Sequence, residues 1–171
     1  MDRAALEPQL HTVRAEEMPL SAEALLGLMR EILALGKHFR FRALGWSMAP
    51  FICDGDVICV SPLAAAGPGI GDVVAFIAPE TERLVVHRVV ARRGAAYLIQ
   101  GDNVRGVTDG TVLAGNILGR VTRITRNGRE VRRGLGPERR LIAVFSRAGW
   151  LSPVRSRLAA LLRPLARRFV L

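Results

Sequence analysis

The chain has 171 residues, half of them hydrophobic, which is enough to build one domain with a buried core. It contains no run of about 18 apolar residues, so the sequence predicts no membrane-spanning helix. It also has no apolar core typical of a signal peptide near the N-terminus. Two cysteines, Cys53 and Cys59, are too few for a disulfide scaffold and lack a metal-binding spacing, which favours a reducing compartment.

The net charge of +10 is concentrated near the C-terminus. Residues 120–171 contain 14 arginines and two acidic residues, a net of +12, whereas residues 1–119 are slightly acidic. The basic character therefore belongs to the C-terminal part of the chain rather than to the whole protein.

Residues 1–37 are predicted to be a leader followed by one helix. Ser21 is a suitable N-cap, apolar residues recur at helical spacing up to Leu33, and Gly36 is a natural stop. A single helix is too short for a DNA-binding helical domain.

Residues 38–134 are predicted to be a mainly β domain with a coiled, barrel-like sheet. The segments are short, rich in apolar and β-branched residues, and bounded by turn formers. Asn127-Gly128 is a strong signal for a type I′ hairpin. The seven expected strands are 39–44, 56–61, 72–77, 84–91, 96–100, 117–125 and 130–133.

Residues 135–171 are predicted to be a basic, amphipathic helical tail, with helical segments over 138–151 and 154–171. In the second segment an apolar face is flanked by arginines, a pattern typical of helices that lie on an anionic membrane surface. The alternative is a helix docked on its own domain or on a partner. Arginine interleaved with leucine and few aromatic residues does not favour nucleic-acid binding.

Ser47 is the candidate nucleophile. It is predicted to lie on a turn between strands, next to the small or rigid residues Gly45, Ala49 and Pro50, where a hydroxyl can be exposed. A serine needs an adjacent base to become a good nucleophile.

His87 is the candidate base because it is embedded in an apolar strand near acidic turns. His11 lies in the leader and His38 at the exit of the first helix. A half-buried structural histidine is the alternative interpretation of His87.

Asp102 and Asp109 are the candidates for orienting the imidazole. Either could accept the imidazole N–H and fix its tautomer. Ordinary turn chemistry is the alternative for both, and it fits Asp109 better than Asp102. Three further aspartates are assigned to turns and backbone hydrogen bonds rather than to catalysis: Asp54, Asp56 and Asp72.

Five motifs in order resemble the superfamily of type I signal peptidases and SOS-repressor proteases, over about residues 39–126. They are Gly-x-Ser-Met-x-Pro (45–50), Asp-Gly-Asp (54–56), Gly-Asp-Val-Val (71–74), His-Arg-Val (87–89) and Gly-Asp-Asn (101–103). Most bacterial members use a serine–lysine dyad. Here the only lysine, Lys37, precedes Ser47, and His87 stands at the position of the base, as in the serine–histidine branch.

This resemblance implies a signal peptidase-type β core and a serine endopeptidase that needs no cofactor or metal. Ser47 would attack a peptide carbonyl, His87 would accept its proton, and Asp102, with or without Asp109, would support the imidazole. The N–H of Ser47 would be an oxyanion donor. Gly45 stands where several relatives carry a hydroxyl residue.

The sequence thus predicts a peptide or precursor-protein substrate and no nucleic-acid partner. It predicts a cytoplasmic protein whose C-terminal tail contacts the membrane peripherally. The second hypothesis is a catalytically inactive accessory protein that keeps the groove but not the hydrolysis.

Overall fold

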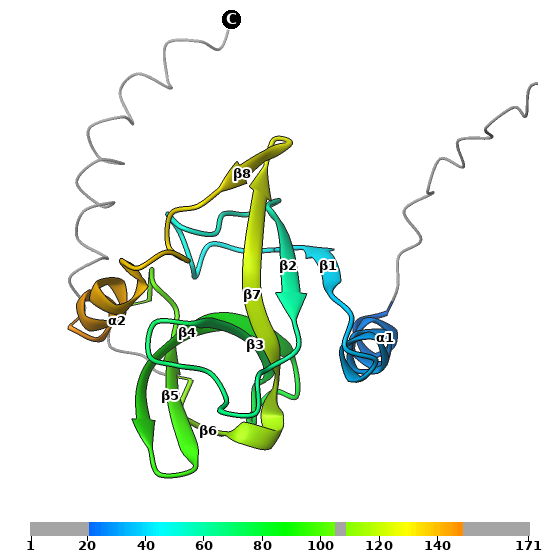
Figure 1. Cartoon of the computed structure of the whole chain (residues 1–171), viewed down its shortest axis with the longest axis horizontal. Helices are drawn as coiled ribbons and strands as arrows, with labels where there is room; N and C mark the ends of the chain where they lie inside the picture. Colours follow the sequence, from blue (N-terminus) through cyan, green and yellow to red (C-terminus); the bar gives the residue numbers. More distant parts are fainter. Residues whose placement is uncertain (1–20, 105–108, 149–171) are drawn as a thin grey trace, which may run out of the picture.

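The computed structural model describes residues 21–104 and 109–148. This part of the chain is mainly β, with one antiparallel sheet that curls into a half-barrel and one helix on each side of it (Figure 1).

The sheet has the strand order β1-β2-β7-β3-β4-β5-β6, and β8 pairs with β7 beyond this path. A short 3-10 helix, Ala114–Asn116, connects β6 to β7. The strands are β1 (Phe39–Arg42), β2 (Val57–Ser61), β3 (Val73–Ile77), β4 (Leu84–Arg93), β5 (Ala96–Gln100), β6 (Thr111–Leu113), β7 (Ile117–Arg126) and β8 (Arg129–Val131).

All seven expected strands are present, although several differ by a few residues at their ends. Sequence analysis missed β6, whose three residues are too short for a recognisable alternating pattern. The predicted hairpin is confirmed: Asn127 and Gly128 both have positive φ, 50° and 76°, between the paired residues Arg126 and Arg129.

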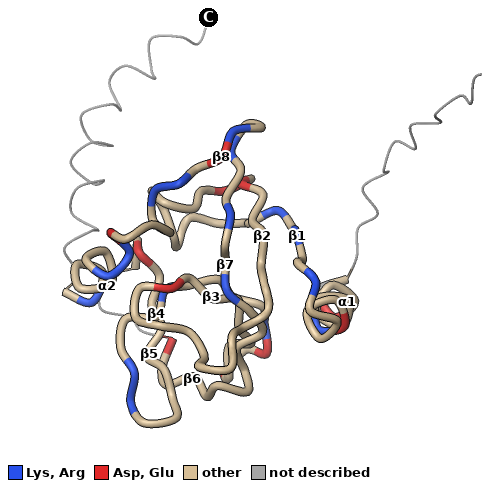
Figure 2. Tube along the Cα trace, in the orientation of Figure 1, with Lys and Arg blue, Asp and Glu red and all other residues tan. Residues whose placement is uncertain are grey.

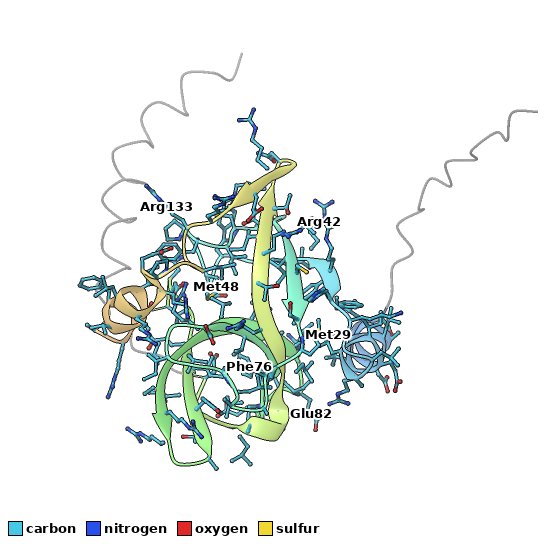
Figure 3. The ribbon with its side chains drawn as sticks, in the orientation of Figure 1. Met29, Arg42, Met48, Phe76, Glu82 and Arg133 are labelled. Carbon is cyan, nitrogen blue, oxygen red and sulfur yellow. The ribbon has the colours of Figure 1, made fainter. Side chains whose placement is uncertain are left out.

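The N-terminal helix, α1 (Ala22–Ala34), has the predicted boundaries. The Ser21 side chain accepts a hydrogen bond from the N–H of Ala24 at 3.2 Å, and Gly36 has a φ of 72° just after the helix. Met29 and Leu33 are buried against the sheet, and Figure 3 labels Met29 on the inner side of α1.

Two apolar clusters make up the core. One joins α1 to β1, β2 and β7 and includes Met48 and Ile52 of the loop after β1. The other fills the curl of β3–β7, where Figure 3 labels Phe76, whose side chain is fully buried. The first cluster therefore anchors the loop that carries Ser47.

The second helix, α2 (Arg139–Arg147), covers the region expected to be helical from residue 138, but it ends before residue 151. Its residues Ile142, Ala143 and Ser146 are buried against the β domain. The expected helical segment over 154–171 lies outside the described residues. No helix in the described ranges is long and apolar enough to cross a membrane.

Candidate active site

Ser47 begins the turn that follows β1. The N–H groups of Phe51 and Ile52 both donate to the carbonyl of Met48, at 3.1 Å each, which closes the turn. Met48 and Ile52 are 4% and 3% exposed, so the turn is fixed in the core while Ser47 stays partly accessible. The sequence places a hydroxyl at the surface on a well-anchored support.

Asp54 and Asp56 hold this turn from outside, as predicted from their turn motifs. Asp54 accepts the N–H of Gly45 at 2.8 Å, and Asp56 accepts the N–H of Cys53 at 2.8 Å. Asp56 also binds Arg126 at 2.8 Å, and Arg126 donates to the carbonyl of Phe51 at 3.2 Å. An ion pair therefore supports the base of residues 47–52, the turn that carries the candidate nucleophile and is here called the nucleophile turn.

The Asp56–Arg126 pair shifts the pKa of both members. Burial acts to raise the pKa of Asp56, but the hydrogen bonds from Arg126 and from the Cys53 N–H outweigh it, and the pKa lies below its usual range. The hydrogen bond to Asp56 raises the pKa of Arg126. Both groups are thus held in their charged forms.

His87 lies on β4 opposite Val74 of β3 and is 8% exposed. Its Nε2 lies 2.8 Å from Ser47 Oγ, which is hydrogen-bonding distance. The ring is also tilted against Phe76 at a centroid distance of 6.4 Å. A rigid strand thus holds the candidate base beside the candidate nucleophile.

Asp109 binds the other nitrogen of the same ring: its Oδ2 lies 2.5 Å from His87 Nδ1. An ionised carboxylate can only accept a hydrogen bond, so in the neutral imidazole the proton is on Nδ1. The lone pair of Nε2 then faces the hydroxyl of Ser47. The N–H of Asp109 donates to the carbonyl of Ile99 at 3.0 Å, which fixes Asp109 beside the end of β5.

Asp102, the favoured partner of His87 in the sequence analysis, is engaged elsewhere, and that preference needs correction. Its carboxylate accepts hydrogen bonds from Nε and Nη2 of Arg88, at 2.8 and 2.7 Å, and from Oγ of Ser146 at 2.7 Å. The side chains of Asp102 and Arg88 are both fully buried. Because successive side chains of a strand point to opposite faces, the neighbouring residues His87 and Arg88 reach different aspartates.

Gly101 and Asn103 touch the nucleophile turn directly. A β-carbon on Gly101 would lie 2.8 Å from the carbonyl oxygen of Ser47 and 3.0 Å from His87 Nε2, so only glycine fits there. The N–H of Asn103 donates to the carbonyl of Ser47 at 2.7 Å, and its amide donates to the carbonyl of Trp46 at 3.1 Å. The Gly-Asp-Asn motif thus supports the site through its outer two residues.

Ser47 and His87 both line one groove, with a cavity volume of about 1270 Å³. Its walls come from α1, β1, the nucleophile turn, the end of β3 and the start of β4. Phe41, Ile52, Leu84 and Val86 give it an apolar surface, and Figure 3 shows the labelled Glu82 at the β3–β4 end of the domain.

The start of β4 borders this groove with an open edge. β3 pairs with β4 from Leu84 onward, whereas the pairing of β5 with β4 begins only at Arg88. β1 is the terminal strand of the sheet. Within the described residues, both strands therefore have a side with no strand partner, and both supply residues to the groove.

The other candidate bases lie away from the site. His38 binds Ser61 through Nδ1 at 2.8 Å, and Lys37 is exposed after α1 and does not line the groove. His11 lies outside the described residues. In the described ranges, no group of three or more His, Cys, Asp or Glu side chains could hold a metal ion.

Sequence reasoning missed the structural roles of Arg88, Arg126 and Ser146. Arg88 was visible as part of the His-Arg-Val motif, but its burial depends on which face of β4 it occupies. Nothing in the sequence around Ser146 indicates that it meets Asp102.

No family model matches this chain, and no curated protein matches it either. The functional interpretation therefore rests on the site geometry. A hydroxyl, an imidazole and a carboxylate joined by two hydrogen bonds can generate a nucleophilic serine.

Proposed function

We propose that this protein is a serine endopeptidase of the signal peptidase type that cleaves a peptide or precursor protein with Ser47, His87 and Asp109. The observation that carries the proposal is the continuous pair of hydrogen bonds from Ser47 Oγ through His87 to Asp109, at 2.8 and 2.5 Å. The resemblance of the five motifs to that superfamily supports the same activity.

In the proposed acylation step, Ser47 Oγ attacks the peptide carbonyl carbon while its proton moves to His87 Nε2. Asp109 stabilises the imidazolium that forms, through Nδ1–H. The N–H of Ser47 donates to the oxyanion, and none of the hydrogen bonds among the described residues occupies it. His87 then returns the proton to the leaving amine, which leaves an ester on Ser47.

In the proposed deacylation step, a water molecule attacks the ester carbonyl and gives its proton to His87 Nε2. The tetrahedral intermediate then breaks the bond to Ser47 Oγ, which takes the proton back from His87. The products are an acid and the restored serine, so no external oxidant, reductant or metal is needed.

The groove supports an extended peptide as the substrate. Among the described residues, one side of β1 and one side of the start of β4 have no strand partner, and these edges could pair with a peptide segment that adds as a strand. The apolar residues Phe41, Leu84 and Val86 favour apolar side chains near the cleaved bond.

The test is labelling of the protein with a serine-reactive acylating probe, in wild type, Ser47→Ala and His87→Ala. The proposal expects a covalent adduct on Ser47 in wild type only, located by mass spectrometry of the digested protein. His38→Ala is the matched control, because His38 binds Ser61 rather than Ser47, and its labelling should equal that of wild type.

Absence of an adduct in folded wild-type protein would overturn the enzymatic proposal. It would favour the alternative, an accessory protein that binds peptides in the same groove. An adduct that survives His87→Ala at the wild-type rate would also count against the mechanism.

We also propose peripheral contact with an anionic membrane surface; the cytoplasmic location stays a prediction from the sequence. The outward side of α2 supports this contact. Leu141 and Val144 are 63% and 62% exposed, and Arg140 and Arg147 beside them are exposed as well. Figure 2 shows basic residues on α2 and along the β7–β8 hairpin. An apolar helix face with cationic flanks suits an anionic lipid interface.

A further inference from the structure

Residues 100–104 form a short connecting segment, here called the strip, that passes between α2 and the nucleophile turn. Its residues alternate in their contacts. Gly101 and Asn103 meet Ser47, as described above, whereas Gln100 and Asp102 bind α2. One side of the strip therefore touches the reactive serine, and the other side is attached to a helix far away in sequence.

Ser146 of α2 makes two hydrogen bonds to the strip. Its Oγ donates to Asp102 Oδ1 at 2.7 Å, and its carbonyl accepts the side-chain amide of Gln100 at 3.0 Å. Ser146 is 2% exposed, as are Gln100 and Asp102. Both bonds are shielded from water, and the one to Asp102 has a charged partner, which makes it the stronger of the two.

The same network includes β4. Arg88 binds Asp102 through two nitrogens and donates with Nη1 to the carbonyls of Gly71 and Gly134, at 2.7 and 2.8 Å. Gly134 lies in the chain that leads into α2. One side of the strip is thus held by β4 and α2 together. The other side contacts the carbonyl of Ser47 and sets its position.

We propose that Ser146 is a positioning residue: from α2 it fixes the strip against the nucleophile turn and so holds Ser47 in line with His87. This inference rests on the proposed acyl-transfer function, which gives that alignment its purpose. Under this inference α2, whose outward side is exposed and apolar, helps to position the residues of the candidate active site.

The experiment compares wild type with Ser146→Ala, which removes the hydroxyl, and with Gln100→Met, which removes the second bond to α2 together with the bond from Gln100 to the carbonyl of Val104 within the strip. Ile142→Val is the matched control, because Ile142 lies on the same buried side of α2 and takes part in none of the hydrogen bonds to the strip. Two quantities are measured for each protein. One is the amide hydrogen-exchange rate of Asn103, whose N–H binds the Ser47 carbonyl, and the other is the pair of constants kinact and KI for the acylating probe.

We expect Ser146→Ala and Gln100→Met to speed exchange at Asn103 and to lower kinact, each by roughly tenfold, with KI unchanged. Ile142→Val should change neither, even where it lowers the unfolding midpoint to a similar extent. A purely structural role would affect the three variants in proportion to their stability.

The inference would be overturned if the changes in Asn103 exchange and in kinact simply followed the loss of stability in all three variants. In that case Ile142→Val would be affected as much as Ser146→Ala and Gln100→Met. If wild-type protein does not react with the probe, the proposed function has failed, and the exchange rate still decides whether Ser146 holds the strip. Faster exchange at Asn103 in Ser146→Ala and not in Ile142→Val would show, in that case too, that Ser146 holds the strip in place.

Discussion

His87 and Arg88 are consecutive residues of β4, and their side chains bind two different aspartates on opposite sides of the strand. His87 binds Asp109 at the groove, and Arg88 binds Asp102 in the interior. The two carboxylates therefore have separate tasks: one is placed to orient the proposed base, and the other neutralises a buried cation. This division leads to opposite expectations for their variants.

Asp102→Asn should destabilise the fold. The change leaves the fully buried guanidinium of Arg88 without a compensating charge, which typically costs about 3–5 kcal/mol. Urea unfolding followed by circular dichroism measures the loss. Asp109→Asn is the comparison, since the Asp109 side chain is 24% exposed, and its loss of stability should stay below about 1 kcal/mol. Equal losses of unfolding free energy in the two variants would contradict the separate roles of Asp102 and Asp109.

Asp109→Asn should instead lower the rate of acylation by the probe, by about 10²–10⁴-fold. An asparagine amide can donate to Nδ1 of His87, which favours the tautomer with a proton on Nε2, facing Ser47. Rapid-mixing labelling gives the rate, and the ¹⁵N chemical shifts of the His87 ring report the tautomer. An unchanged rate would mean that Asp109 has no part in the reaction.

Gly101→Ala should reduce acylation far more than Gly115→Ala. The added methyl group would lie 2.8 Å from the Ser47 carbonyl oxygen and 3.0 Å from His87 Nε2, so the nucleophile turn must shift. A displacement of about 1 Å in such a site can cost about 10²-fold in rate. Gly115 has open space around its α-carbon, so Gly115→Ala controls for the general effect of the substitution. If the probe acylates Gly101→Ala at the wild-type rate, the strip is not in firm contact with Ser47.

The Asp56–Arg126 pair should stabilise the fold except in acid. The pKa of Asp56 is lower in the folded state than the usual value of about 3.9, so its stabilisation is fully present above about pH 4 to 5. It is lost as the pH falls through the lowered folded-state value.

The measurement for this pair is the difference in unfolding free energy between wild type and Asp56→Asn as a function of pH. That difference should be constant near neutral pH and begin to shrink below about pH 4. It should level off once the pH lies below the lowered folded-state pKa of Asp56, where the protonated carboxyl is uncharged like the asparagine amide. A difference that stays constant down to pH 2 would show that the pair does not depend on the charge of Asp56.

The double change Leu141→Ser with Val144→Ser should weaken binding to anionic phospholipid vesicles by about tenfold or more. Each apolar side chain that enters the interface contributes about 1.5–3 kcal/mol, and 1.4 kcal/mol corresponds to a tenfold change in affinity. Leu113→Ser is the control, since Leu113 is 60% exposed but lies on β6. Vesicle sedimentation at low and high salt measures the affinity, and equal binding by all three proteins would contradict contact through α2.

Local pattern was sufficient for most of the elements. The capped helix α1, seven of the eight strands and the Asn127-Gly128 turn follow from periodicity, turn residues and capping, which act over a few neighbouring residues. The strand β6 was not predicted, because three residues are too few to show an alternating pattern. The assignment of Asp54, Asp56 and Asp72 to turns was correct for the same reason, since each binds an N–H nearby in the chain or across one loop.

The site was predictable as a set of residues but not as a set of contacts. Of the four residues predicted from their types and motifs, Ser47, His87 and Asp109 lie together, whereas Asp102 binds Arg88 instead. The choice between Asp102 and Asp109 was beyond local pattern, because both stand in turns of similar composition.

The sequence by itself determined the elements, the nucleophile turn and the residue types available to the site. Only the tertiary structure decided which aspartate meets His87, that Arg88 is buried, and that Ser146 reaches the strip from α2. The physical reason is that local order depends on backbone geometry and side-chain spacing over a few residues. The pairing of buried charges depends instead on how the sheet curls and where the last helix packs, which bring together residues far apart in the chain.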